Sequence, residues 1–66
     1  MNEHVIASRL QTALAERDRL THRYQSAVGT NAELTAYARL QAANLAVANA
    51  DRIARATRLA ERHPTP

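Results

Sequence analysis

The sequence has 66 residues, no cysteine and a formal net charge of +3, with nine arginines set against six acidic residues. This length allows at most one small domain, and the lack of cysteine excludes disulfides and thiolate metal sites. Fifteen of the hydrophobic residues are alanine, and phenylalanine and tryptophan are absent, so one copy can bury only a small core. We therefore expect a single domain over residues 1–66 that completes its core with a second copy or another protein.

The first segment with a helical pattern extends from about residue 3 to residue 28. Asn2 is a suitable N-cap, and Glu3 in the first turn complements the helix dipole. Apolar residues then recur every three or four positions along one face. Positions with heptad spacing define this face, namely Ile6, Leu10, Ala13, Arg17, Leu20, Tyr24 and Ala27. The pattern predicts a helix with a coiled-coil-like contact seam.

Arg17 is the one charged residue in this seam. The favoured interpretation is a side chain that lays its methylenes on the seam and keeps its guanidinium at the rim. A buried pair with a carboxylate and a contact to a partner are the alternatives. If Arg17 occupies a place that suits leucine, Arg17→Leu is expected to raise the thermal stability.

A turn is predicted at residues 29–30. Gly29 is the only glycine, and glycine readily takes the left-handed conformation that ends many helices. Thr30 and Glu33 match a capping box, in which the threonine hydroxyl accepts from the Glu33 N–H and the glutamate accepts from the Thr30 N–H. These signals favour a helical hairpin, and the alternative is one continuous helix that tolerates a glycine.

The second predicted helix spans about residues 31–62. Pro64 ends it, and residues 63–66 form a frayed tail. This helix is longer than the first, so its C-terminal end should overhang. It has two apolar stripes, one of Ala36, Leu40, Ala43, Val47, Ala50 and Ala54, and one of Leu34, Ala38, Ala42, Leu45, Ile53, Ala56 and Ala60. Two stripes predict two neighbours, of which one is the first helix and the other a second protomer or a foreign helix.

Four arginines lie near the end of the second helix. Arg52, Arg55, Arg58 and Arg62 share one broad face, which is a candidate nucleic-acid contact because such a stripe can follow phosphates. An ordinary solvated face is the stronger interpretation, since Asp51 and Arg55 form a favourable four-apart pair and aromatic residues are not interleaved. The sequence therefore favours a protein partner over a nucleic acid.

Chemical motifs are lacking. The histidines are His4, His22 and His63, and even a pairing of the first and last would lack the carboxylate or thiolate that a metal site needs. No serine or threonine has an evident base, so we expect neither catalysis nor a cofactor or small-molecule substrate. The chain has no apolar run of membrane-spanning length and no signal-peptide pattern, so a cytoplasmic protein is expected.

Two antiparallel helices around a tight turn resemble the layout of the secreted WXG-type hairpins and of Rop-like hairpins. Here Ala27-Val28-Gly29 stands where the first group has Trp-x-Gly, and no residue motif is shared with the second, so the sequence assigns no family.

The fold class expected is therefore all-α, an antiparallel hairpin that self-associates into a four-helix bundle or a coiled-coil-like oligomer. The expected function is a non-enzymatic protein–protein interaction module, an accessory protein of a bacterium or phage. The alternative is a Rop-like RNA or DNA binder that uses the arginine stripe. The expected interface residues are Ile6, Leu10, Arg17, Leu20, Tyr24, Leu34, Leu40, Leu45, Val47 and Ile53.

Overall fold

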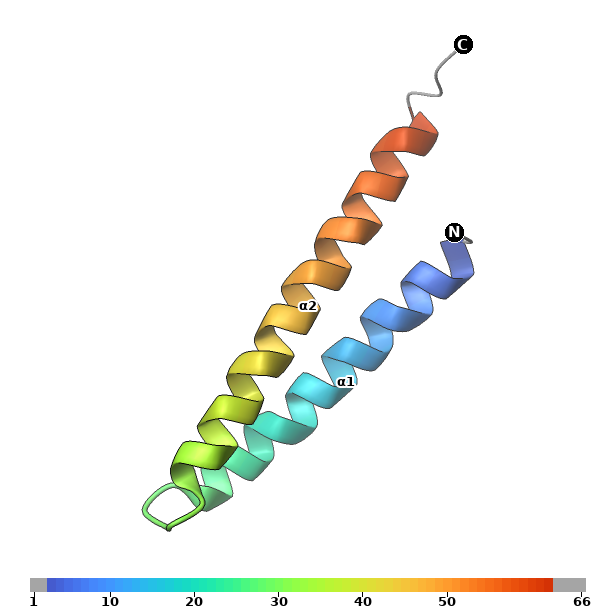
Figure 1. Ribbon diagram of the computed structural model, residues 1–66. Coiled ribbons are helices and arrows are strands. Elements are labelled where there is room, and N and C mark those ends of the chain that lie inside the picture. The colour runs from blue at the N-terminus through green and yellow to red at the C-terminus, as the bar shows by residue number, and fades with distance from the viewer. Residues whose placement is uncertain (1–2, 63–66) are drawn as a thin grey trace.

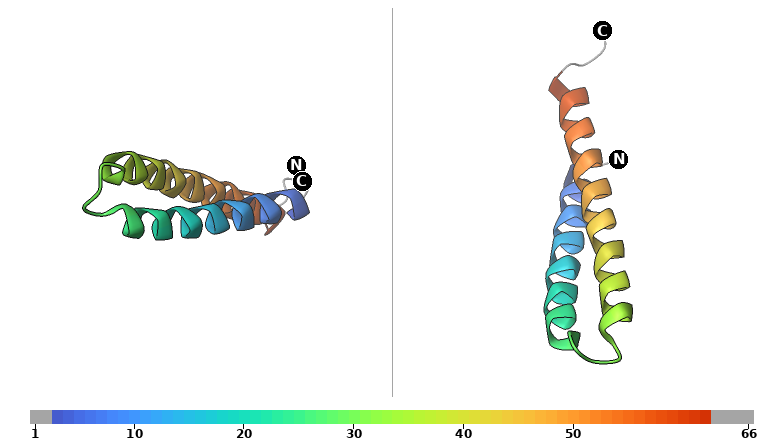
Figure 2. Two further views of the ribbon diagram at one scale, coloured as in Figure 1. Left: turned by 90° about the horizontal axis from the view of Figure 1, so that it is seen from below. Right: turned by 90° about the vertical axis from the view of Figure 1, so that its left-hand side faces the viewer.

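Two antiparallel α-helices make up the fold in a computed structural model that describes residues 3–62. Helix α1 spans Glu3–Ala27, and helix α2 spans Glu33–Arg62. Figure 1 shows the helices side by side along the length of α1, and α2 extends beyond the N-terminal end of α1. The two turned views in Figure 2 show the same single layer of two helices. The hairpin and its overhang are therefore as predicted, and the continuous-helix alternative is wrong.

The connection between the helices is longer than the sequence indicates. It covers residues 28–32 instead of the predicted residues 29–30, because α1 ends one residue earlier and α2 begins two residues later. The N–H of Thr30 donates to the carbonyl of Ala27 over 2.9 Å, which closes the end of α1. The predicted N-cap Asn2 and the predicted tail 63–66 lie outside the described residues.

Gly29 has the predicted left-handed conformation, with a φ of 83°. The capping box, however, uses other atoms than predicted. The Glu33 carboxylate accepts from the N–H of Gly29 over 2.9 Å, and the Thr30 hydroxyl accepts from the N–H of Ala32 over 3.2 Å. The hydrogen-bond partners differ from the prediction because of the turn. The Thr30 N–H already donates to the Ala27 carbonyl, so the Glu33 carboxylate accepts from the Gly29 N–H instead.

The core lies along the line where the two helices meet. Its buried residues are Ile6 and Leu20 from α1 and Ala43, Val47 and Ala54 from α2. These belong to the predicted seam of the first helix and to the first predicted stripe of the second. Among residues 3–62 no side chain is fully buried, so the core of one copy is thin.

Two tyrosines pack together near the turn. The ring centroids of Tyr24 and Tyr37 are 5.7 Å apart, and the ring planes are tilted by 57°. This tilted contact is a favourable arrangement for aromatic pairs. It ties the start of α2 to the end of α1 beside the five-residue connection.

Neither of the two described helices combines the length and the apolar composition that crossing a bilayer requires.

Candidate interaction surfaces

The outer face of α2 is the main candidate surface. We define it by three large aliphatic residues of α2 that are exposed, namely Leu34, Leu45 and Leu59. Ile53 is exposed too, but it precedes the buried Ala54 and lies on the flank of the helix. Leu45 lies two residues from both Ala43 and Val47, and two residues correspond to roughly 200° of helical rotation. Because Ala43 and Val47 are buried against α1, the outer face points away from α1. The second stripe thus has no neighbour within the hairpin.

Leu59 belongs to this face, although neither the predicted stripe nor the predicted interface includes it. The arginines around it suggested a solvated or phosphate-binding segment and obscured its role. Its spacing of fourteen residues from Leu45 equals two heptads and is the signal that would have found it. Its side chain is more than half exposed.

The structure divides the ten predicted interface residues into two groups. One group lies at the contact between α1 and α2 of the same chain, buried or half-buried: Ile6, Leu10, Leu20, Tyr24, Leu40 and Val47. The other group is exposed: Arg17, Leu34, Leu45 and Ile53. The exposed group is the more accessible to another molecule, and three of its four residues lie on α2.

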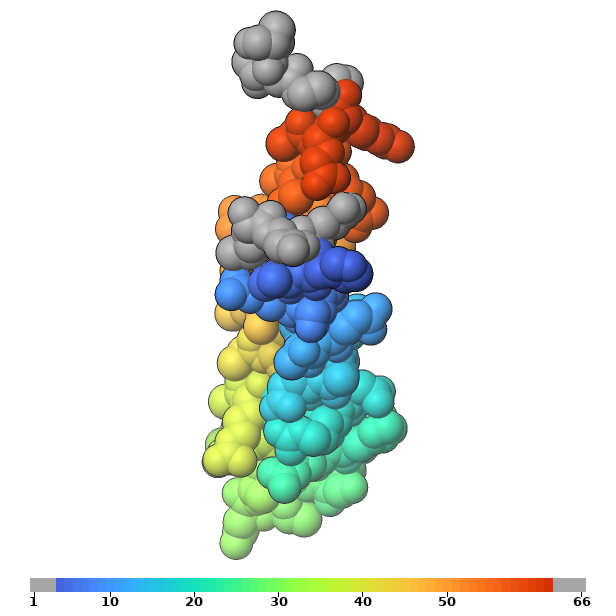
Figure 3. Space-filling model, turned by 90° about the vertical axis from the view of Figure 1, so that its right-hand side faces the viewer, coloured from blue at the N-terminus to red at the C-terminus, as the bar shows by residue number. Residues whose placement is uncertain are grey.

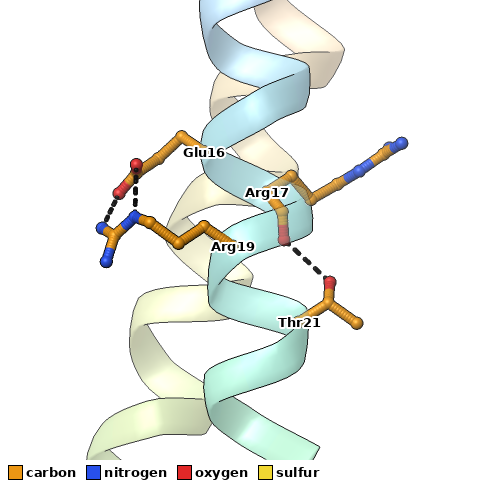
Figure 4. Close-up of polar contacts among 4 residues, drawn as sticks. All are labelled: Glu16, Arg17, Arg19 and Thr21. Atoms are coloured by element: carbon orange, nitrogen blue, oxygen red, sulfur yellow. Dashed lines mark hydrogen bonds and ion pairs between the residues drawn. The ribbon is translucent and has the colours of Figure 1, made fainter.

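Arg17 is exposed although its spacing places it in the α1 seam. Figure 4 shows its side chain extending sideways from α1. Its backbone carbonyl accepts from the Thr21 hydroxyl over 2.8 Å, while its guanidinium makes no hydrogen bond or ion pair within residues 3–62. The structure therefore does not pair Arg17 with a carboxylate, and its exposure fits a guanidinium held at the rim.

One flank of α1 differs in chemistry from the outer face of α2, and there Glu16 and Arg19 line a shallow hollow together with Ala42 and Ala43 of α2. Arg19 donates from Nε to the Glu16 carboxylate over 3.0 Å and from its terminal nitrogen to the second carboxylate oxygen (Figure 4). This hydrogen bond lowers the pKa of the Glu16 carboxyl and raises the pKa of the Arg19 guanidinium. Both side chains are about half exposed, so this is an ordinary solvated surface with little bearing on stability.

The four arginines of the predicted nucleic-acid contact do not act alike. Arg55 forms an ion pair with Asp51 over 3.0 Å, and Arg52 donates to the Asn49 side chain over 2.8 Å. The guanidinium groups of Arg58 and Arg62 have no hydrogen-bond or ion-pair partner among the described residues.

Arg55, Arg58 and Arg62 line one open hollow of about 520 Å³ together with Leu59 and Glu61. Arg52 is not part of the lining. The hollow lies in the last turns of α2, which project beyond α1 in the space-filling view (Figure 3). Three of the four predicted arginines are thus brought together near the C-terminal end of α2, where Arg58 also borders a hollow shared with Ile6 and Ala7 of α1.

Two further arginines lie close together only because the chain folds into a hairpin. Arg23 of α1 and Arg39 of α2 both line an open groove between the helices, whose lining includes Leu20 and Ala36. The sequence gives no sign of this pair. Sixteen positions separate the two residues along the chain, and no local pattern connects them.

No protein-family model matches this chain, and no curated protein or solved structure matches it either. The functional interpretation therefore rests on the chemistry of the surfaces described above.

Proposed function

We propose that this protein is a small, non-enzymatic interaction module that associates through the outer face of α2, first of all with a second copy of itself. The exposure of its leucines carries the proposal. Leu34, Leu45 and Leu59 are 80%, 72% and 56% exposed. Burying such a side chain is worth about 1.5–3 kcal/mol. A row of them along one helix marks a contact surface.

The thin core supports the same proposal. A 66-residue chain is close to the size at which domains need help from metals, disulfides or association. Cysteine is absent, and only five residues, two of them alanines, form the buried core of the described hairpin. Association of two hairpins brings four helices together, as the predicted bundle or coiled-coil-like oligomer requires.

Sedimentation equilibrium at micromolar concentrations tests this proposal. We expect the wild-type protein to be a dimer and Leu45→Arg to be a monomer, because arginine places a charge in the apolar contact. Ala15→Arg is the matched control, since it adds the same charge at an exposed position on the outer face of α1. It should remain dimeric. A helical wild-type monomer, or equal effects of the two substitutions, would overturn the proposal.

Nucleic-acid binding is a second candidate, and one observation favours it. Arg58 and Arg62 lack partners among the described residues and line the hollow at the end of α2, where their guanidinium groups are available to phosphates. Binding to random single-stranded RNA at low salt tests this function. A nucleic-acid binder should lose affinity as salt rises and when the three arginines of the hollow, Arg55, Arg58 and Arg62, are replaced by glutamine. Absent binding, or binding that the triple variant retains, would exclude it.

A further inference from the structure

We propose that two copies pair antiparallel through the outer faces of α2, around a twofold axis that crosses their contact at the level of Ala46 and Val47. The two α1 helices then lie on the outside of a four-helix layer. This inference rests on the proposed self-association and specifies which face and which direction it uses.

A heptad seam on the exposed side of α2 is the first observation. Positions at alternating intervals of four and three residues are all exposed: Leu34, Ala38, Gln41, Leu45, Ala48, Arg52, Arg55 and Leu59. This is the spacing by which one helix packs along another. The seam extends over most of α2, and both of its ends are leucines. A second helix of the same length and pattern is a suitable occupant.

Charge selects the direction of pairing. Residues 51–62 contain four arginines and two acidic residues, whereas residues 33–44 contain one arginine and one glutamate. A parallel pair would place both arginine-rich ends together, with Arg52 against Arg52 of the second copy. An antiparallel pair separates these two residues by roughly 16 Å along the helix axis. That distance exceeds the Debye length of about 8 Å at physiological salt.

The antiparallel register also matches side chains by size and polarity. With the axis near Ala46 and Val47, Leu34 faces Leu59 of the second copy, and Leu45 faces the small Ala48. Gln41 faces Arg52, and its amide oxygen is an acceptor for the guanidinium. Ala38 faces Arg55, whose guanidinium is paired with Asp51 of its own helix. The same face is thus complementary to itself, as a twofold interface requires.

The position of α1 decides the shape of the dimer. The outer face of α2 lies on the side opposite to the buried Ala43 and Val47. A second α2 on that face therefore cannot also contact α1 of the first copy. The four helices form an open layer in the order α1, α2, α2, α1. The sequence predicts a four-helix bundle or a coiled-coil-like oligomer, and this arrangement differs from a closed bundle, in which each helix contacts two neighbours on adjacent faces.

Single cysteines test the pairing, because the chain has none of its own. Leu34→Cys and Leu59→Cys change exposed positions, so the hairpin should stay intact. Mixed and mildly oxidised, the two variants should give mainly the disulfide between positions 34 and 59 by mass spectrometry, while each variant alone gives little. Ala15→Cys on the outer face of α1 controls for random collision. Predominant disulfides between two copies of the same variant would overturn the antiparallel pairing.

Spin labels attached to the Leu34→Cys variant supply a measurement that does not depend on oxidation. Antiparallel pairing predicts roughly 37 Å between the two labelled positions along the axis. Parallel pairing predicts about 10 Å, and such a short distance would overturn the inference. If Leu45→Arg dissociates the dimer but the labels are about 10 Å apart, the antiparallel direction of pairing is wrong and the proposed function stays intact. A wild-type monomer in sedimentation contradicts both.

Discussion

The two faces of α2 differ in an unusual way, because the smaller apolar side chains are buried and larger ones are exposed. The face against α1 buries Ala43, Val47 and Ala54, whereas the opposite face exposes Leu34 and Leu45. Larger aliphatic side chains are among the residues most often buried. Small residues on the inner face let the two helix backbones approach closely, and the larger ones remain for a second contact. The difference identifies the outer face as the part of the molecule that a single hairpin leaves unsatisfied.

Helix α1 sharpens this contrast because its arrangement is ordinary. Glu16 and Arg19 pair in water on its flank, and the large apolar residues Ile6 and Leu20 are buried on the inner face. One helix thus follows the usual amphipathic pattern, and the other has apolar residues on two sides. The asymmetry favours α2 as the helix that carries the proposed interaction surface.

The largest expected effect is on the inner face. Leu20→Ala should lower the free energy of unfolding by about 2–3 kcal/mol, because Leu20 is only 7% exposed. Leu45→Ala should change it by less than about 0.5 kcal/mol at concentrations where the protein is monomeric. Urea denaturation followed by circular dichroism measures both. Equal losses in the monomer would mean that the two faces are not distinct.

The second largest effect on stability is expected at the turn, which brings the inner face of α2 onto α1. Gly29→Ala should destabilise the hairpin by about 1 kcal/mol, because the φ of Gly29 is 83°. An added Cβ would meet no atom within 4 Å, so the loss is conformational and not steric. Gly29→Asn should lose less, since asparagine tolerates this conformation. Thermal unfolding compares the variants, and an unchanged midpoint for alanine would contradict the prediction.

Arg17→Leu should have a smaller effect than its seam position suggests. The sequence predicts a gain in stability, which requires position 17 to pack against α2. Because Arg17 is exposed, we now expect a change within about 0.5 kcal/mol. Thermal unfolding at several protein concentrations is the measurement. A clear gain at every concentration would show packing on α2, and a gain that grows with concentration would place Arg17 at the contact between copies.

The smallest effect concerns the polar pair of Glu16 and Arg19 on the flank of α1. The hydrogen bond from Arg19 lowers the pKa of Glu16 in the folded state. The contribution of this hydrogen bond to stability is therefore present above the unfolded pKa of glutamate, about 4.3. It is lost as the pH falls through the lowered folded pKa. Wild type should therefore exceed Glu16→Gln slightly in melting temperature at neutral pH and low salt, with the difference vanishing in acid. A difference that persists in acid would indicate another cause.

Local interactions explain why much of the hairpin is predictable. The helical spacing of Ile6 and Leu20 indicated the face of α1 that meets α2, whereas the spacing of Ala43 and Val47 marked only one of two candidate faces of α2. Gly29 marked the turn, because one residue type dominates left-handed positions. The capping atoms were mispredicted, since the length of the turn determines which N–H remains unpaired. Leu59 was missed because neighbouring arginines suggested a different role for that segment.

The sequence by itself determined the two helices and the place of the turn, because these depend on interactions within a few residues. Which stripe of α2 packs against α1 was decided only by the tertiary structure. Both stripes have the helical period, and the five-residue connection sets the side of α2 that meets α1. The packing of α2 on α1 also brings Arg23 beside Arg39 in one groove and leaves Leu45 facing away from α1. Only the tertiary structure could decide these relations, because they depend on distances through space and not along the chain.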